Sequence, residues 1–255
     1  MIRSALEQRP GGLVARVTID NPAKLNILSP STLQELKKEI QKAGANSALR
    51  AIVLSGAGEK AFVGGAQLET LGSLDPKSAR EFITLIHEAC AAMRECPVPV
   101  VARINGWCLG AGLEIAACCD LRLAAAHAVF GMPEVRLGIP SVVEAAMLPR
   151  LVGAGRARWL VMTGETIDAE RALAWGLIEE VFSPGTFEKD FNQRIDALLS
   201  GDAEALRAQK RLCRLWEEAP LAESVRASID EFAASYGKGE PNRRIAAFRA
   251  ARAKR

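Results

Sequence analysis

Two glutamates and two glycine-rich turns are the residues best suited to chemistry in this chain. Glu114 lies in the apolar run Leu113–Cys119, directly after the turn Gly110-Ala111-Gly112. A carboxyl group among apolar neighbours ionises at a higher pH than in water and can exchange protons near neutrality. Glu134 follows Met132-Pro133 at another predicted turn. The sequence therefore indicates general acid–base chemistry, with Glu114 as the first candidate.

The two glycine-rich turns can supply backbone N–H groups. They are Phe62–Leu68 and Cys108–Gly112, and neither has the spacing of a P-loop or of a dinucleotide-binding G-x-G-x-x-G motif. Taken singly, each is typical of a close-packing turn. As a pair they can donate two N–H groups to one oxygen, which is what an enolate or thioester oxyanion needs. A helix N-terminus after the second turn adds partial positive charge.

Other interpretations of the acids stay open at this stage. Glu114 can neutralise a helix N-terminus or pair with a buried arginine such as Arg122, and Glu134 can be an exposed loop acid. Glu144 is a third candidate, although its position in the first turn of a predicted helix favours a role at that helix end. Pattern alone does not choose between these interpretations.

The elements that must position these residues alternate between strands and helices. Strands are expected at 13–19, 51–55, 98–104, 120–124 and 177–182. Helices are expected from 29–31 to 43, at 76–96 with Asp75 as N-cap, at 113–119, and in segments from 143 onward. Residues 56–66 read as a loop, and the pattern after Pro184 is entirely helical. These elements predict an α/β core over residues 1–200 and a helical region over 201–255.

Composition excludes several classes of protein. The chain has 255 residues, a net charge of +3 and six cysteines without a CxxC pair, and its two histidines stand alone. This argues against a metal site and for reduced thiols in a cytoplasmic protein, with the histidines as core or surface residues. No apolar run has the length of a membrane span or signal peptide. The weak net charge argues against nucleic acid. A solvated helix face is the favoured interpretation of the basic C-terminal residues, with a contact to phosphate as the alternative: Arg243, Arg244, Arg249, Arg252, Lys254 and Arg255.

Five segments, in this order, resemble the motifs of the crotonase family, the enoyl-CoA hydratase/isomerase superfamily. Asn21–Leu28 resembles N-x-P-x-x-x-N-A-L, and Phe62–Leu68 resembles F-x-A-G-A-D-L. Asn105–Glu114 resembles N-G-x-x-x-G-G-G-x-E, Phe130–Glu134 resembles F-G-x-P-E, and Phe248–Arg252 resembles the terminal F-x-x-K-R. Each motif is weak alone, but five in the right order over nearly the whole chain are highly specific.

The resemblance implies a fold, an assembly and a set of site residues. The fold is a spiral of β-β-α turns, with C-terminal helices that build homotrimers, commonly paired into hexamers. By position, Ala66 and Ala111 would donate their backbone N–H groups to the thioester oxygen of an acyl-CoA. The residues expected to bind the substrate and its CoA are Ala23, Lys24, Leu25, Gly64, Ala66, Gln67, Leu68, Gly110, Ala111, Phe248 and Arg252.

The same resemblance implies hydration of a trans-2-enoyl-CoA to a 3-hydroxyacyl-CoA. Family hydratases carry acids at both positions matched by Glu114 and Glu134, whereas double-bond isomerases usually keep only the second. Glu114 would hold and deprotonate the water, and Glu134 would transfer a proton at C2. No cofactor beyond the CoA of the substrate is implied, because neither step transfers electrons. Isomerisation, hydration of a specialised acyl group and a non-catalytic or RNA-binding role are the alternatives.

Several residues depart from the family pattern. Gln67 stands where many members have Asp, Ala111 replaces the middle glycine of its turn, and Ala251 replaces the terminal Lys. Ser141-Val142-Val143-Glu144 replaces a glycine-rich stretch that lines the acyl pocket in relatives. The added bulk and the extra acid leave the identity of the acyl group open.

Overall fold

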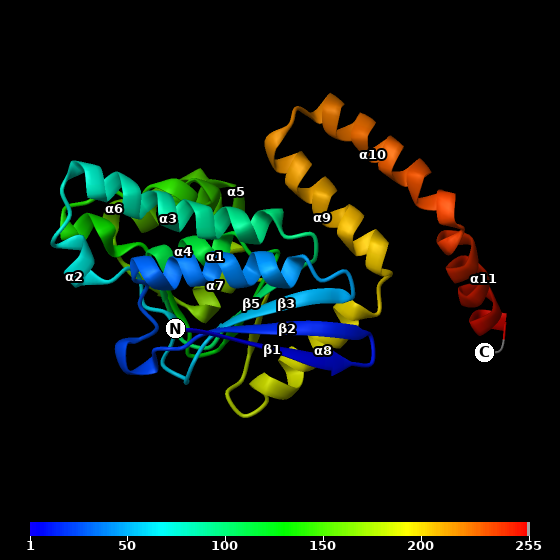
Figure 1. Cartoon of the computed structure of the whole chain (residues 1–255), viewed down its shortest axis with the longest axis horizontal. Helices are drawn as coiled ribbons and strands as arrows, with labels where there is room; N and C mark the ends of the chain where they lie inside the picture. The colour runs from blue at the N-terminus through cyan, green and yellow to red at the C-terminus, as the bar shows by residue number, and fades with distance from the viewer. Residues whose placement is uncertain (254–255) are drawn as a thin grey trace. The chain divides into compact units, whose positions relative to one another are not determined.

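The computed structural model describes residues 1–253 and contains two compact units, Met1–Ser200 and a second that begins at Gly201. All strands found in the described residues lie in the first unit (Figure 1). They are β1 (Ile2–Arg9), β2 (Gly12–Ile19), β3 (Leu49–Gly56), β4 (Ala61–Val63), β5 (Val100–Ile104), β6 (Trp107–Leu109), β7 (Leu121–Ala125), β8 (Val129–Gly131), β9 (Thr166–Asp168) and β10 (Glu180–Phe182).

The helices of the first unit fill the intervals between these strands. They are α1 (Pro30–Gly44), α2 (Leu68–Leu71), α3 (Pro76–Glu95), α4 (Ala111–Ala117), α5 (Leu148–Val152), α6 (Ala154–Thr163), α7 (Ala169–Trp175) and α8 (Phe187–Leu199). Three single-turn 3-10 helices, η1 (Pro22–Lys24), η2 (Pro133–Leu137) and η3 (Val143–Met147), connect them.

The strands form two sheets that the chain visits in turn. One sheet has the order β1-β2-β3-β5-β7-β10 and the other the order β4-β6-β8-β9. Thus β3 is followed by β4, β5 by β6 and β7 by β8, each pair placing one strand in each sheet. The pairings from β2 through β10 in the larger sheet are parallel, as helical crossovers require. This arrangement is the predicted α/β spiral of β-β-α turns.

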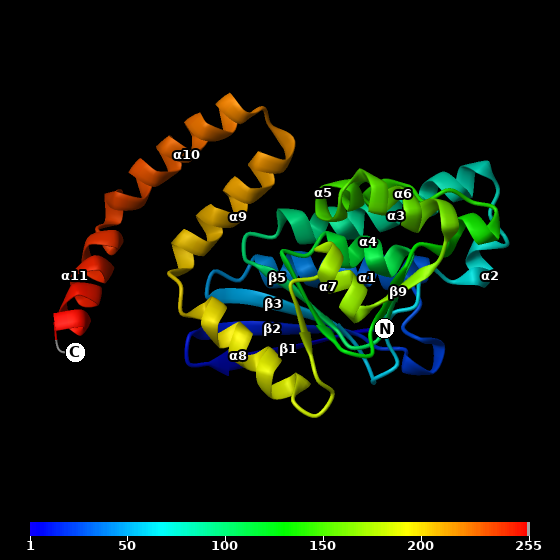
Figure 2. The ribbon, with the colours of Figure 1, turned by 180° about the vertical axis from the view of Figure 1, so that it is seen from behind.

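Both faces of the larger sheet are covered by helices. On β3, Ile52 and Leu54 belong to the core shared with α1 and α3, whereas Ala51 and Val53 belong to a second core against α8. Successive strand residues point to opposite faces, so one continuous apolar strand serves both cores. Figure 1 shows α1 and α3 along one face of the sheet, and Figure 2 shows α8 on the other.

The two long helices start where their capping residues predict. The Ser29 hydroxyl accepts from the backbone N–H of Thr32 at the start of α1, and Pro30 occupies the first helical position. Asp75 and Ser78 form a reciprocal capping box at the start of α3, which ends just before Pro97. The positions of α3 and of the segments packed on it are therefore set by local sequence.

The fold differs from the predicted elements in several places, among them β8, which lies at a predicted turn, and β9 and α2, which were not predicted. Strand β1 was not expected, because most of its residues are exposed and carry no apolar alternation. Strand β4 lies inside the predicted loop, and β6 separates β5 from the turn before Glu114, so that strand does not lead straight into the helix. Both are three residues long, too short for a periodic pattern. The helix expected from residue 143 begins as the 3-10 turn η3.

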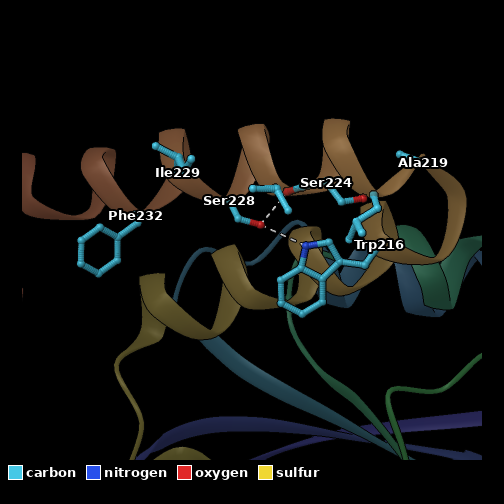
Figure 3. A pocket seen from close by; sticks show the side chains of 8 residues that line it. Trp216, Ala219, Ser224, Ser228, Ile229 and Phe232 are labelled. Atoms are coloured by element: carbon cyan, nitrogen blue, oxygen red, sulfur yellow. Dashed lines mark hydrogen bonds between the residues drawn. The ribbon is translucent and has the colours of Figure 1, made fainter.

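The second unit is helical, with α9 (Ala203–Glu218), α10 (Leu221–Ser235), η4 (Tyr236–Lys238) and α11 (Glu240–Ala253). The indole N–H of Trp216 on α9 donates to the Ser228 hydroxyl on α10 over 3.1 Å, and Ser228 donates to the carbonyl of Ser224 (Figure 3). Lys254 and Arg255, part of the basic segment noted above, lie outside the described residues.

The six cysteines are free thiols, five of them buried. In residues 1–253, no group of three or more His, Cys, Asp and Glu side chains is arranged to hold a metal ion. Within the same residues, the helices lack the combination of length and apolar character needed to cross a membrane.

Candidate active site

A cavity of about 560 Å³ in the first unit brings the two glutamates together. Eight predicted site residues line it: Leu25, Gly64, Ala66, Leu68, Gly110, Ala111, Glu114 and Glu134. Lys24 and Gln67 lie next to lining residues in the chain, and Ala23 lies two residues before Leu25, but none of the three is on the cavity wall. Phe248 and Arg252 belong to α11 of the second unit, where both are exposed and the Arg252 guanidinium lies over the Phe248 ring.

Glu114 is the deeper of the two acids. It lies in the first turn of α4 and is 4% exposed. Its Oε1 accepts the backbone N–H of Ala145 over 3.1 Å. The alternative pairing with Arg122 is wrong, because that guanidinium binds Glu179 and the carbonyls of Cys119 and Leu177. Arg122 therefore does not hold the charge of Glu114, which lines the cavity.

Two glycines allow α4 to start at this place. Gly110, the N-cap, has φ of +53°, and a Cβ there would lie 2.5 Å from Oε1 of Glu134. A Cβ on Gly112 would lie 2.4 Å from the carbonyl oxygen of Val63 in β4. The first glycine makes room for the second acid, and the second lets α4 pack on the backbone of the smaller sheet.

Glu134 reaches the same cavity from η2. Its Oε2 accepts the hydroxyl of Ser141 over 2.9 Å, and Oε1 lies beside Gly110, as the glycine geometry shows. The residue is half-buried, so the interpretation of Glu134 as an exposed loop acid is wrong. The two carboxyl groups thus approach one space from different elements, one held by a backbone amide and the other by a side-chain hydroxyl.

The surroundings give the two acids different proton affinities. Burial raises the pKa of Glu114 to about 8; the negative charges of Glu134 and Glu144 act in the same direction, and the Ala145 amide opposes them. Burial also raises the pKa of Glu134, opposed by its own backbone amide and by the Ser141 hydroxyl. Burial thus raises the proton affinity of both acids, and it brings the pKa of Glu114 into the range of neutral pH.

Two backbone amides on the cavity wall are left without a carbonyl acceptor. Leu28 bonds to both chain neighbours of Ala66, donating to the Gly65 carbonyl and accepting from the Gln67 amide, so Ala66 points its own N–H away from Leu28. Ala111 is the first residue of α4 and has no carbonyl one turn earlier in the helix. Within residues 1–253, neither amide donates to a backbone oxygen.

Several lining residues were not singled out from the sequence. Phe82, Ile83 and Ile86 come from one face of α3, and their helical spacing was a usable signal. Ser141 and the Ala145 amide bind the two acids, but nothing in the sequence indicates that a hydroxyl or an amide from this segment would reach them. Contacts made by a connecting segment depend on its backbone path, which local pattern does not give.

That segment contains a strained residue. Val143 has φ of +42°, a region that β-branched residues rarely adopt and that costs about 1–3 kcal/mol. The position falls in Ser141–Glu144, the stretch that departs from the glycine-rich segment of the family pattern described above. The backbone N–H of Ala145 donates to the Val142 carbonyl and to Glu114, and these two hydrogen bonds hold the segment in the strained conformation.

Comparison with known proteins decides the family. The sequence model described as enoyl-CoA hydratase/isomerase matches residues 10–249. The chain belongs to this family. A crotonyl-CoA hydratase of Syntrophomonas wolfei is 32% identical over 92% of this chain and 91% of its own. A short-chain-enoyl-CoA hydratase of Clostridium acetobutylicum is 37% identical over 78% of this chain and 77% of its own.

Solved structures of the enoyl-CoA hydratase/isomerase family share the fold. The crystal structure of an enoyl-CoA hydratase from Bacillus anthracis superposes with a TM-score of 0.90, covers 97% of this chain and 96% of its own, and is 27% identical. The predicted crotonase-type fold is therefore confirmed. The family description covers both hydratases and isomerases. The choice between the two activities therefore depends on the acids in the cavity.

Proposed function

We propose that this chain is a hydro-lyase that adds water across the C2=C3 bond of a trans-2-enoyl-CoA to give a 3-hydroxyacyl-CoA. The supporting observation is that Glu114 and Glu134, with different surroundings, line one cavity with the Ala66 and Ala111 amides. Relatives that carry the name of crotonyl-CoA or short-chain enoyl-CoA hydratases point the same way.

The chemistry follows from charge development in the thioester. Water attack at C3 pushes electrons through C2 onto the thioester oxygen, and the Ala66 and Ala111 amides would donate to that oxygen. Glu114, in its ionised form, takes a proton from the attacking water. Glu134, in its protonated form, delivers a proton to C2. Both protons are accounted for, no electron leaves the substrate, and the reaction needs no redox or metal cofactor.

The remaining predicted substrate contacts are part of this proposal. Lys24, the last residue of η1, is exposed near Leu25 on the cavity edge and offers a cation to the phosphates of CoA. Gln67 accepts from Thr70 through its side chain, so its contribution to the substrate would come from the backbone. Phe248 and Arg252 present an exposed ring and cation, which suit an adenine and a phosphate.

The second unit supports the proposed homotrimer or hexamer. On α10, Leu221, Val225, Ile229 and Phe232 are 49–81% exposed and follow one helical stripe. They line a hollow of about 560 Å³ beside Trp216, shown in Figure 3. Large exposed apolar stripes mark protein–protein contacts, and a second copy of this chain is the proposed partner.

We place the assembled enzyme in the cytoplasm, in line with its reduced thiols.

Isomerisation of a 3-enoyl-CoA is the second candidate function, because the family description includes it. It needs one acid to move a proton between carbons, and Glu134 with the two amides would suffice. The buried carboxyl of Glu114 favours hydration, since an isomerase has no use for a second acid that costs folding energy to keep in an apolar site.

A spectrophotometric assay against enoyl-CoA thioesters of increasing chain length tests the proposal. Loss of the conjugated double-bond absorbance with formation of 3-hydroxyacyl-CoA is the expected result. A folded protein that binds CoA, leaves all linear 2-enoyl-CoA substrates unchanged and converts 3-enoyl-CoA to 2-enoyl-CoA would replace hydratase by isomerase.

A further inference from the structure

A third carboxyl group, that of Glu144, lies behind Glu114. Glu144 is in the first turn of η3 and is 8% exposed. Its chain neighbour Ala145 donates the backbone N–H that Glu114 accepts. Glu144 is not among the residues that line the cavity. Its connection to the site is the Ala145 amide that Glu114 accepts.

His87 contacts the carboxyl group of Glu144. Its Nδ1 lies 2.6 Å from Oε1 of Glu144, and the histidine side chain, on α3, is 56% exposed. The other oxygen of Glu144, Oε2, is buried and has no hydrogen-bond partner among the described residues. Half-satisfied buried carboxyl groups are costly, so their presence calls for a physical reason.

The backbone fixes this arrangement. Val143, with φ of +42°, turns the chain immediately before Glu144, and the Ala145 amide donates to the Val142 carbonyl as well as to Glu114. Moving Glu144 would therefore move the amide that holds Glu114. The connecting segment links a half-exposed imidazole to the deepest acid of the cavity through two residues.

The groups around Glu144 come from four elements. From α3, His87 and Cys90 face it. A hydrogen bond with Cys118 and burial raise the pKa of the Cys90 thiol, which therefore stays neutral. From α4 comes Glu114, whose own pKa Glu144 raises, and beyond it Glu134. Farther along, Arg94 of α3 donates to the sulfur of Met147, and α5 carries the exposed Arg150. Of these groups, His87 is the one whose ring nitrogen lies within hydrogen-bond distance of Glu144.

We infer that Glu144 is a positioning residue: held by His87, it keeps the Ala145 amide on Glu114 and sets, through its negative charge, how readily Glu114 releases its proton. Only the effect of Glu144 on catalysis rests on the proposed function. The linkage between His87, Glu144 and Glu114 is a property of the folded protein without substrate, and it can be measured as such.

The test is direct titration of Glu114 in protein labelled with ¹³C at the glutamate carboxyl groups, with Glu114→Gln to assign its signal. In Glu144→Gln, which keeps the shape but removes the charge, the Glu114 midpoint should fall by on the order of one pH unit. Glu81→Gln, on the exposed surface of α3, removes the same charge elsewhere and should leave the midpoint in place. An unmoved midpoint in Glu144→Gln overturns the inference.

Histidine variants separate the holding role from a merely structural one. His87→Asn keeps a donor near Oε1 of Glu144 and should titrate like the unmodified protein. His87→Ala leaves the charge of Glu144 in place but loosens the Ala145 amide, which lowers the pKa of Glu114, so the Glu114 midpoint should rise, opposite in direction to Glu144→Gln. If both histidine variants leave the midpoint unchanged, His87 does not hold the charge, and that half of the inference fails. Because no turnover is needed, failure of hydration would leave these results standing.

The same variants carry a second readout if the protein hydrates enoyl-CoA. The alkaline limb of the pH profile of kcat/KM should move to lower pH in Glu144→Gln by the same amount as the titration midpoint. A structural role alone would lower kcat/KM at every pH and leave the position of the limb unchanged, which would contradict the inference.

Discussion

Glu114 and Glu134 face one cavity from opposite kinds of local structure. Glu114 is almost fully buried on a helix and is held by one backbone amide, whereas Glu134 is half-buried on a 3-10 turn and is held by a serine hydroxyl. The more buried acid keeps its proton to the higher pH. The same functional group thus acquires two proton affinities from burial and donor type alone.

This difference has a consequence for the direction of the reaction. Hydration starts with Glu114 ionised and Glu134 protonated, and it ends with the proton positions exchanged. A pKa of about 8 makes Glu114 a good proton acceptor once it is ionised, and it lets the same residue return the proton in the reverse reaction, the loss of water from a 3-hydroxyacyl-CoA. By microscopic reversibility one pair of acids serves both directions.

The largest expected effect comes from replacing each acid by its amide. Glu114→Gln should lower the hydration rate by roughly 10²–10⁴-fold, because the water loses its base. Glu134→Gln should lower it to a similar extent through loss of the proton donor at C2. The two variants should differ in isomerisation of a 3-enoyl-CoA, which Glu114→Gln retains and Glu134→Gln loses.

Product analysis with 2-enoyl and 3-enoyl substrates checks both variants. Equal loss of isomerisation in the two variants would show that Glu114 also handles the C2 proton. Near-normal hydration by Glu114→Gln would remove this residue from the mechanism altogether.

A second, smaller effect concerns stability. The pKa of Glu114 is about 8 in the folded protein and about 4.5 in an ordinary setting. Between these values the folded state binds the additional proton, so the free energy of unfolding falls as pH rises. Glu114→Gln removes the titrating carboxyl group and with it this fall in the free energy of unfolding. The variant should exceed the unmodified protein in stability by on the order of a few kcal/mol at pH 9 and differ little below pH 4.5.

Urea unfolding at several pH values measures this difference. Glu81→Gln is a suitable control, because it alters an exposed charge on the surface of α3 and should leave the pH dependence unchanged. Parallel stability curves for Glu114→Gln and the unmodified protein would mean that Glu114 does not keep its proton through the neutral range.

The contrast between the two acids also separates what the sequence predicts from what it does not. Capping residues and apolar periodicity were sufficient for α1, α3 and the strands of the larger sheet other than β1. The short strands β4 and β6 carry too few residues for a pattern, although they position both glycine-rich turns. Glu114 and Glu134 were recognisable because acids among apolar or turn residues are unusual.

The donors to these acids were not recognisable. Ser141 and the Ala145 amide come from a segment whose path turns at Val143, in a backbone conformation that the residue type disfavours. Local propensity predicts the opposite conformation there, so only the packing of η3 against α3 and α4 determines where the segment runs. The proton affinities of the two acids depend on those donors, so the sequence did not predict them either.

The smallest expected effect concerns Ser141, whose hydroxyl lowers the pKa of Glu134 by stabilising its charged form. Ser141→Ala removes this bond, so the acid limb of the kcat/KM profile should move to higher pH by roughly 0.5–1 unit, while the alkaline limb stays in place. The ratio of activity at pH 5.5 to that at pH 7.5 should fall a few-fold. Ser141→Thr keeps a hydroxyl and should preserve the profile. A shift of both limbs in Ser141→Ala would mean that the two acids titrate as one unit and that the separate environments of Glu114 and Glu134 do not set separate proton affinities.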